Sequence, residues 1–134
     1  MASLERRSFT SPDTSRRFRR RGHIESITVA GAEIAQATFE PGWHWATDMK
    51  PEAGTPSCQE EHTGYILRGR LHVLYDDGQS LDLERGDVFH LPSGHDAWTI
   101  GNEACVMIDF AGMVRSLEAG SPRSHRYDPG LERG

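Results

Sequence analysis

The chain of 134 residues lacks several features that define other classes of protein. It contains no apolar run of about 18 residues, so the sequence predicts no transmembrane helix. Residues 1–7 do not have the apolar stretch of a secretory signal peptide, which predicts a cytoplasmic protein. The only two cysteines are Cys58 and Cys105, too few for a disulfide framework. Each is therefore predicted to be a reduced thiol, and one of them could serve as a metal ligand.

Helical patterning is also scarce. Apolar residues make up 36% of the chain, and 14 glycines and 7 prolines indicate many turns and short strands. From residue 23 onward apolar and polar residues alternate with a period of two, and turn residues recur at intervals of about ten. The sequence predicts a single all-β domain, a barrel or sandwich of about nine strands with helix content under about 15%.

Charge is divided unevenly along the chain, whose net charge is -5. Residues 1–21 hold seven of the fifteen basic residues and only two acidic ones, whereas residues 22–110 carry a net charge of -11. An arginine run can bind nucleic acid or an anionic membrane, but the field of so acidic a body would repel phosphate. We therefore expect neither partner, and we expect the basic N-terminal arm, residues 1–21, to lie on an acidic surface of its own or a neighbouring subunit.

The alternation also predicts the domain limits and the interior. A β-barrel is expected over residues 22–112, and residues 113–134 are expected to form a weakly structured C-terminal tail. The apolar side chains predicted to fill the barrel are Leu71, Val73, Leu81, Leu83, Val106 and Ile108.

Two motifs carry a family resemblance. Tyr65–Arg68 followed by Gly69 resembles the first motif of the cupin superfamily, and Gly86 followed by Pro92-x-Gly94 resembles the second. More narrowly, three segments resemble small single-domain bacterial cupins without a settled activity: Pro41–Trp45, Ser57–Gln59 and Gly94–Trp98. The resemblance covers residues 33–110 and implies a single cupin barrel, that is, a double-stranded β-helix or jelly roll. Its functional implication is broad, since cupins include metal-dependent enzymes, metal-free sugar enzymes and ligand sensors.

The metal-binding pattern of that family is not reproduced literally. The family's first motif supplies two histidines spaced by one residue and then a glutamate seven residues before the glycine, and its second motif supplies another histidine. Here the glutamate position holds His62, the second histidine position falls near Cys58, and the last histidine position holds Ala97. The remaining position falls on Thr55 or Pro56.

A substitute set of ligands is nevertheless available. His95 lies two residues before Ala97 and so shares its strand face, and Cys58 and His62 share a parity. A thiolate and two neutral imidazoles would suit Zn²⁺ or a similar borderline metal with an open fourth position. The alternative is a metal-free pocket, in which His62 is held by hydrogen bonds, Cys58 packs as a small apolar residue and His95 caps its strand.

A small-molecule pocket is predicted beside these residues. The expected ligand-binding residues are Trp43, Trp45, Gln59, Tyr65, His90 and Trp98, although core packing explains the tryptophans equally well. Glu60 and Asp96 are the candidates to move a proton. The connection over residues 46–57 is long enough to form a lid, with Lys50 as its cation, whereas His72 is predicted on the outer face.

Two functions from different classes follow. The preferred one is a ligand sensor or accessory protein that binds a small molecule without converting it, because no complete catalytic set is visible. The alternative is a metal-dependent enzyme that acts on a small carbonyl or carboxylate substrate. Small cupins pair through their N-terminal strands, and the charge division also favours contact between subunits, so a homodimer is expected.

Overall fold

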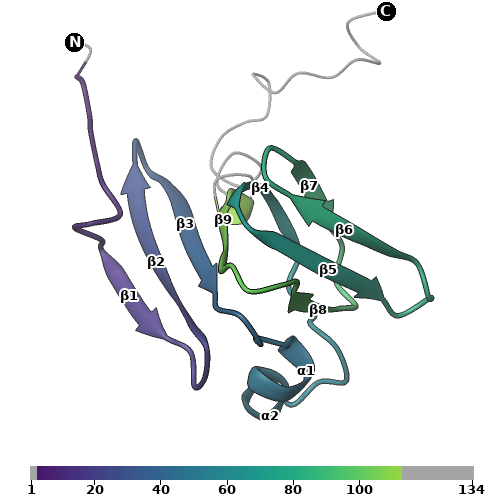
Figure 1. Ribbon diagram of the computed structural model, residues 1–134. Helices are drawn as coiled ribbons and strands as arrows, with labels where there is room; N and C mark the ends of the chain where they lie inside the picture. Colours follow the sequence, from purple (N-terminus) through teal and green to yellow (C-terminus); the bar gives the residue numbers. More distant parts are fainter. Residues whose placement is uncertain (1–2, 113–134) are drawn as a thin grey trace, which may run out of the picture.

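The computed structural model describes residues 3–112, so the predicted C-terminal tail lies outside the described residues (Figure 1). Strand accounts for 49% of the structure and helix for 9%, which confirms the all-β prediction. In chain order the elements are β1 (Thr14–Arg17), β2 (Gly22–Val29), β3 (Ala32–Phe39), α1 (Trp45–Asp48), α2 (Lys50–Ala53), β4 (His62–Arg68), β5 (Arg70–Tyr75), β6 (Ser80–Glu84), β7 (Val88–Leu91), β8 (His95–Thr99) and β9 (Cys105–Asp109).

The strands form two antiparallel sheets. The larger has the order β1-β2-β3-β9-β4-β7 and the smaller the order β6-β5-β8. Two isolated bridges join chain segments to β8, one between His44 and Trp98 and one between Cys58 and His95. The second bridge matters most here because it brings the segment before β4 against the first residue of β8.

Two glycines allow close backbone approaches on β4. Gly69 follows the last residue of the strand with a φ of 76°, and a Cβ there would meet the carbonyl oxygen of Ala104 at 2.2 Å. A Cβ on Gly64 would meet the carbonyl oxygen of Ile108 at 2.1 Å. Only glycine fits at these two positions, and the close pairing of β4 with β9 that they permit places His62 beside Asp109.

The buried core lies between the sheets and only partly matches the predicted interior. Leu71, Val73 and Leu83 are buried as expected, but Leu81 is 48% exposed because it lies on the edge strand β6. On β9 the predicted face is wrong. Met107 lines the interior cavity, so its alternating neighbours Val106 and Ile108 lie on the opposite face.

The N-terminal arm contributes to the sheet. β1 pairs with β2 and forms an edge of the larger sheet (Figure 1). Beyond β1, Phe18 is buried in the core and stacks on Phe39 with ring centroids 5.9 Å apart. Arg17 lies 3.9 Å from Glu40, and Arg21 bonds Asp48 at 3.2 Å, so the arm meets acidic residues of its own chain.

The long connection between β3 and β4 contains the two short helices (Figure 1). Its anchor is Asp48, whose side chain is fully buried and accepts hydrogen bonds from the backbone N–H of His44 and from Arg21. Met49 and Ala53 of this connection line the interior cavity, whereas Lys50 does not. The connection therefore forms part of the cavity wall. None of the helices in the described residues is long and apolar enough to span a membrane.

Candidate metal centre

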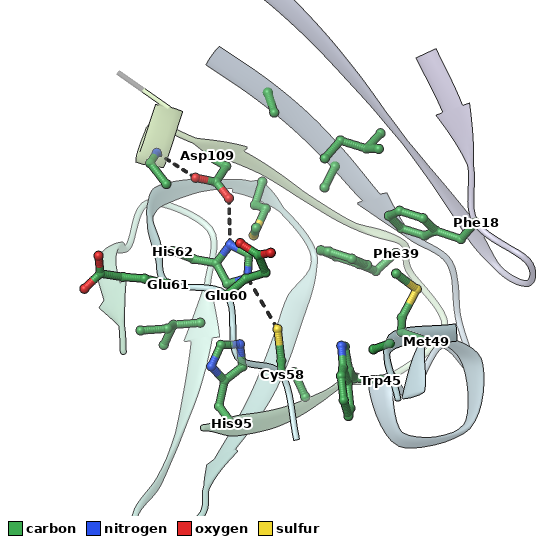
Figure 2. A pocket seen from close by; sticks show the side chains of 18 of the residues that line it. Phe18, Phe39, Trp45, Met49, Cys58, Glu60, Glu61, His62, His95 and Asp109 are labelled. Carbon is green, nitrogen blue, oxygen red and sulfur yellow. Dashed lines mark hydrogen bonds and ion pairs between the residues drawn. The ribbon is translucent and has the colours of Figure 1, made fainter. Parts of the chain in front are cut away.

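Three potential ligands converge from the two sheets. Cys58 is fixed to β8 by hydrogen bonds from its N–H to the His95 carbonyl and from the Gly94 N–H to its own carbonyl, each 2.7 Å long. His62 begins β4 and His95 begins β8. The sulfur of Cys58 and one ring nitrogen of each histidine all lie within 4.8 Å of one another (Figure 2). Cys58 and His95 are buried and His62 is half-buried.

A hydrogen bond at Nδ1 fixes the orientation of each imidazole. Nδ1 of His62 donates to Asp109 Oδ2 at 2.7 Å, and Nδ1 of His95 donates to the Pro92 carbonyl at 2.9 Å. Each bond leaves Nε2 as the nitrogen available to a ligand, and Nε2 of His62 lies 3.8 Å from Cys58 Sγ. Histidines that bind metals in proteins are usually oriented in this way, by a carboxylate or a carbonyl on the other nitrogen.

The electrostatics of the site favour an ionised sulfur. Burial alone would raise the pKa of the Cys58 thiol, but interactions with His62 and His95 and a backbone N–H outweigh burial and bring the pKa down to about 6. Burial likewise lowers the pKa of His62, but Asp109 and Cys58 outweigh it and raise the pKa to about 9. Without a metal, Cys58 and His62 therefore form a thiolate–imidazolium pair near neutral pH.

The donor set fits a borderline divalent metal. One thiolate and two imidazoles match the sulfur and nitrogen ligands that Zn²⁺ prefers, and three protein ligands leave one position open. Asp109 also accepts a hydrogen bond from the Ala111 N–H at 2.7 Å, so its carboxylate is held firmly while it orients His62. The residues present thus fit a metal site of the open type that Cys58, His62 and His95 would hold.

The ligands open into a cavity of about 700 Å³. Its apolar wall comes from both sheets and the long connection, and includes Phe18, Phe39, Trp43, Trp45, Met49, Leu91 and Met107. The indole N–H of Trp43 is buried and has no hydrogen-bond partner within residues 3–112. An apolar cavity with a few converging polar groups is the common form of a small-molecule site.

Four of the predicted pocket residues line this cavity. Trp43 and Trp45 are buried in its wall, and the exposed side chains of Gln59 and Glu60 lie at its rim. Gln59 donates hydrogen bonds to Ser57, which holds its amide away from the ligands. Glu60 and Glu61 both line the cavity, and the carboxylate of Glu61 points away from His62 (Figure 2).

Tyr65 and His90 were predicted to bind a ligand, but neither lines the cavity. On β4, His62 and Ile66 face inward, so Tyr65 faces outward by alternation. His90 bonds Thr63 Oγ1 at 2.9 Å outside the cavity. These two predictions are corrected by the strand parity of β4 and β7.

Asp96 and Trp98 are likewise displaced, because β8 directs His95 and Ala97 inward and the residues between them outward. Asp96 accepts hydrogen bonds from His44 Nε2 at 2.8 Å and from the Ala46 N–H at 3.1 Å. Trp98 packs between two histidine rings, with centroids 5.0 Å from His44 and 4.5 Å from His72. These residues, together with Asp82, which bonds His72, form what we call the outer histidine group. Asp96, predicted to move a proton, therefore lies outside the cavity.

Asp109 was missed by the sequence analysis. It ends β9, and β9 had been given the opposite face because its residues from Cys105 to Ile108 are all apolar and show no alternation. A signal was present, since Asp109 is the acidic residue that ends the most apolar strand. A buried carboxylate in such a strand needs a partner, and here that partner is His62.

The fold and the site together define a small double-sheet β protein with a cavity between its sheets. The cupin domain family matches residues 38–111, more than half of the chain, and the chain belongs to this family. No curated protein matches it.

Solved structures agree on the fold. A protein of unknown function from Acinetobacter sp. ADP1 is 12% identical with a TM-score of 0.54, and 73% of this chain covers 89% of that one. The polyketide cyclase RemF from Streptomyces resistomycificus is 16% identical with a TM-score of 0.56, over 80% of this chain and 78% of that one. Oxalate decarboxylase from Lactobacillus farciminis is 16% identical with a TM-score of 0.54, over 84% of this chain but only 34% of its own. At these identities the similarity shows the fold alone.

Proposed function

We propose that this cupin binds one divalent transition metal ion of the zinc type through Cys58, His62 and His95, and that it binds a small molecule in the adjoining cavity. The observation that carries the proposal is the convergence of three ligand atoms within 4.8 Å, with Nδ1 of both histidines engaged elsewhere. When bound, such a metal supplies a Lewis acid for an oxygen of the ligand. The protein then acts as a sensor or accessory cupin whose apolar walls select the ligand.

Metal content is the direct test. The full chain is purified without a histidine tag, and its metal is measured by mass spectrometry before and after reconstitution with zinc. We expect about one ion per chain, and we expect the His95→Ala and Cys58→Ser variants to retain almost none while keeping the β circular dichroism spectrum. A wild-type protein that neither carries nor takes up a divalent metal contradicts the proposal.

A second candidate, a metal-dependent enzyme, is favoured by Glu60. This side chain lines the cavity that also holds Cys58, His62 and His95, and could accept or donate a proton on a small carbonyl or carboxylate substrate. The metal-loaded protein would be incubated with a panel of such compounds and followed by NMR. Turnover that is lost in Glu60→Gln and kept in Glu61→Gln supports the enzyme. Glu61 is the matched control because its carboxylate lies 3.3 Å from His90. Binding without turnover supports the sensor.

Assembly as a homodimer and a cytoplasmic location both stay predictions. For the homodimer, light scattering at low micromolar concentration is expected to give twice the chain mass of 15.0 kDa. A mass of one chain in moderate salt would contradict it.

A further inference from the structure

Two arginines of the N-terminal arm reach the cavity that holds the candidate metal centre. Arg16 pairs with Ile24 of β2, and Ile24 pairs with Ala37 of β3; all three line the cavity. Arg19, just after β1, lines it as well. Arg17 alternates to the other side, where its side chain is 77% exposed and lies 3.9 Å from Glu40. Arg16 and Arg17 are therefore neighbours in sequence with opposite orientations.

An aromatic ring positions the Arg16 guanidinium. Its Cζ lies 5.5 Å from the ring centroid of Phe18, which stacks in turn on Phe39. A guanidinium over an aromatic face gains a cation–π contribution and keeps its in-plane N–H donors free for a carboxylate. Because a bidentate carboxylate matches that arrangement of donors, Arg16 is suited to bind an anionic group.

An apolar stretch separates the arginines from the metal ligands. In Figure 2, Phe39, Met49 and Trp45 lie between Phe18 on one side and Cys58 with His62 on the other. A ligand that reached both ends would bury an apolar body against these side chains, which favours binding.

The other charged residues of the lining restrict where a ligand can carry charge. Asp109 is bonded to His62, and Glu61 lies against His90. Glu33, Glu52 and Glu60 also line the cavity and would repel an anionic group placed beside them. Among the described lining residues Arg16 and Arg19 are the two permanent cations, so an anionic group is favoured at their end of the cavity.

We infer that Arg16 and Arg19 form an anion-binding end of the cavity, and that the ligand is a small organic acid with charge at its ends and an apolar body between them. One polar end faces Cys58, His62 and His95, and a carboxylate at the other end binds the arginines. Only the part of the inference that concerns the end facing Cys58, His62 and His95 rests on the proposed function. It also gives the basic arm a role in recognising the ligand.

The probes that test it are linear α,ω-dicarboxylates from succinate to sebacate and the monocarboxylates of equal length. Binding to the zinc-loaded full chain is measured by calorimetry and by tryptophan fluorescence, since Trp43 and Trp45 line the cavity. We expect one dicarboxylate length to bind at least about ten-fold more tightly than its monocarboxylate, the usual size of one charge-assisted contact. The Arg16→Gln/Arg19→Gln variant should lose that advantage, and Arg17→Gln should keep it.

Controls separate this inference from the proposed function. Zinc content is measured on every sample and should be unchanged in the arginine variants, so that a lost advantage with zinc retained reports on the arm alone. The milder Arg16→Lys, which keeps the charge but not the planar donors, should bind the dicarboxylate with intermediate affinity. The inference is overturned if dicarboxylates bind no more tightly than monocarboxylates, or if Arg17→Gln weakens them as much as the double variant does. Absence of zinc from the wild type overturns the proposed function instead.

Discussion

Two groups of histidines, one in the cavity between the sheets and one on the outer face of the small sheet, resemble each other locally and differ in what they can do. In the cavity, the second nitrogens of His62 and His95 converge with the sulfur of Cys58. On the outer face, His44 and His72 each bond a carboxylate, but the indole of Trp98 lies between their rings. Both groups thus contain histidines bonded to carboxylates, but among the described residues only the cavity group adds a third donor atom that converges with the histidines.

Strand β8 supplies residues to both groups. His95 faces the cavity, while Asp96 and Trp98 face outward. Because successive side chains on a strand point to opposite faces, a shift of one residue would exchange the two sets. The contrast between the faces can therefore be tested with matched variants.

The largest expected effect is on metal retention. His62→Ala removes a converging ligand and should abolish zinc binding, whereas His72→Ala on the outer face should leave it unchanged. Both variants should keep the β circular dichroism spectrum, since neither side chain belongs to the buried core. Equal zinc loss in the two variants would mean that binding is a nonspecific property of surface histidines.

The next effect concerns the carboxylates behind the histidines. Asp109→Asn weakens the hydrogen bond that orients His62 and should lower zinc affinity about 10- to 100-fold. Asp96→Asn, which alters the partner of His44, should not change zinc affinity. Competition with a chelating dye measures both values, and an unchanged affinity in Asp109→Asn would argue against a role for this carboxylate.

Thiol reactivity should show a smaller and pH-dependent contrast. With zinc removed, the pKa of about 6 for Cys58 means that its thiolate fraction, and so its rate of alkylation by iodoacetamide, rises about ten-fold between pH 5 and pH 7. Burial raises the pKa of Cys105 to about 12, so that thiol should stay unmodified. Mass spectrometry of the alkylated peptides gives both rates. A midpoint for Cys58 near the ordinary thiol value would contradict the predicted ion pair with His62.

The smallest effect is on stability. His72→Ala removes a ring contact with Trp98 and an ion pair with the exposed Asp82, and should lower the free energy of unfolding by less than about 1 kcal/mol. Urea denaturation measures the change. A decrease of several kcal/mol in the free energy of unfolding would contradict this prediction and would mean that the outer histidine group stabilises the fold.

The fold could be predicted because its signals are local. Gly69 and Gly86 lie at turns with positive φ, and the alternation from residue 23 onward marked the strands. Cys58, His62 and His95 were grouped by their places in the two cupin motifs and by parity, and the structure brings them together.

Other parts of the site depend on tertiary contacts that the local pattern does not report. β9 is apolar on both faces, so its inward face could not be inferred and Asp109 was missed. On β8 the small Ala97 faces inward and the large Trp98 outward, the reverse of what side-chain size suggests. Arg16 of β1 and Arg19 just after it reach the cavity because the polar segment Thr14–Arg17 pairs with the edge of β2, and no alternation in the sequence predicts that pairing.

The ion pair between Arg21 and Asp48 limits where the chain can be shortened. The Asp48 carboxylate is fully buried, and Arg21 is the last residue of the arm. Deleting residues 1–21 would leave that carboxylate without its cation, at a cost on the order of 3 kcal/mol, and would also remove Phe18 from the core. In an experiment with such a truncated chain, a loss of folding would be mistaken for a loss of assembly or of ligand recognition. A cut before residue 14 leaves β1, Phe18 and Arg21 in place, and recognition is better tested by substituting Arg16 and Arg19 than by truncation.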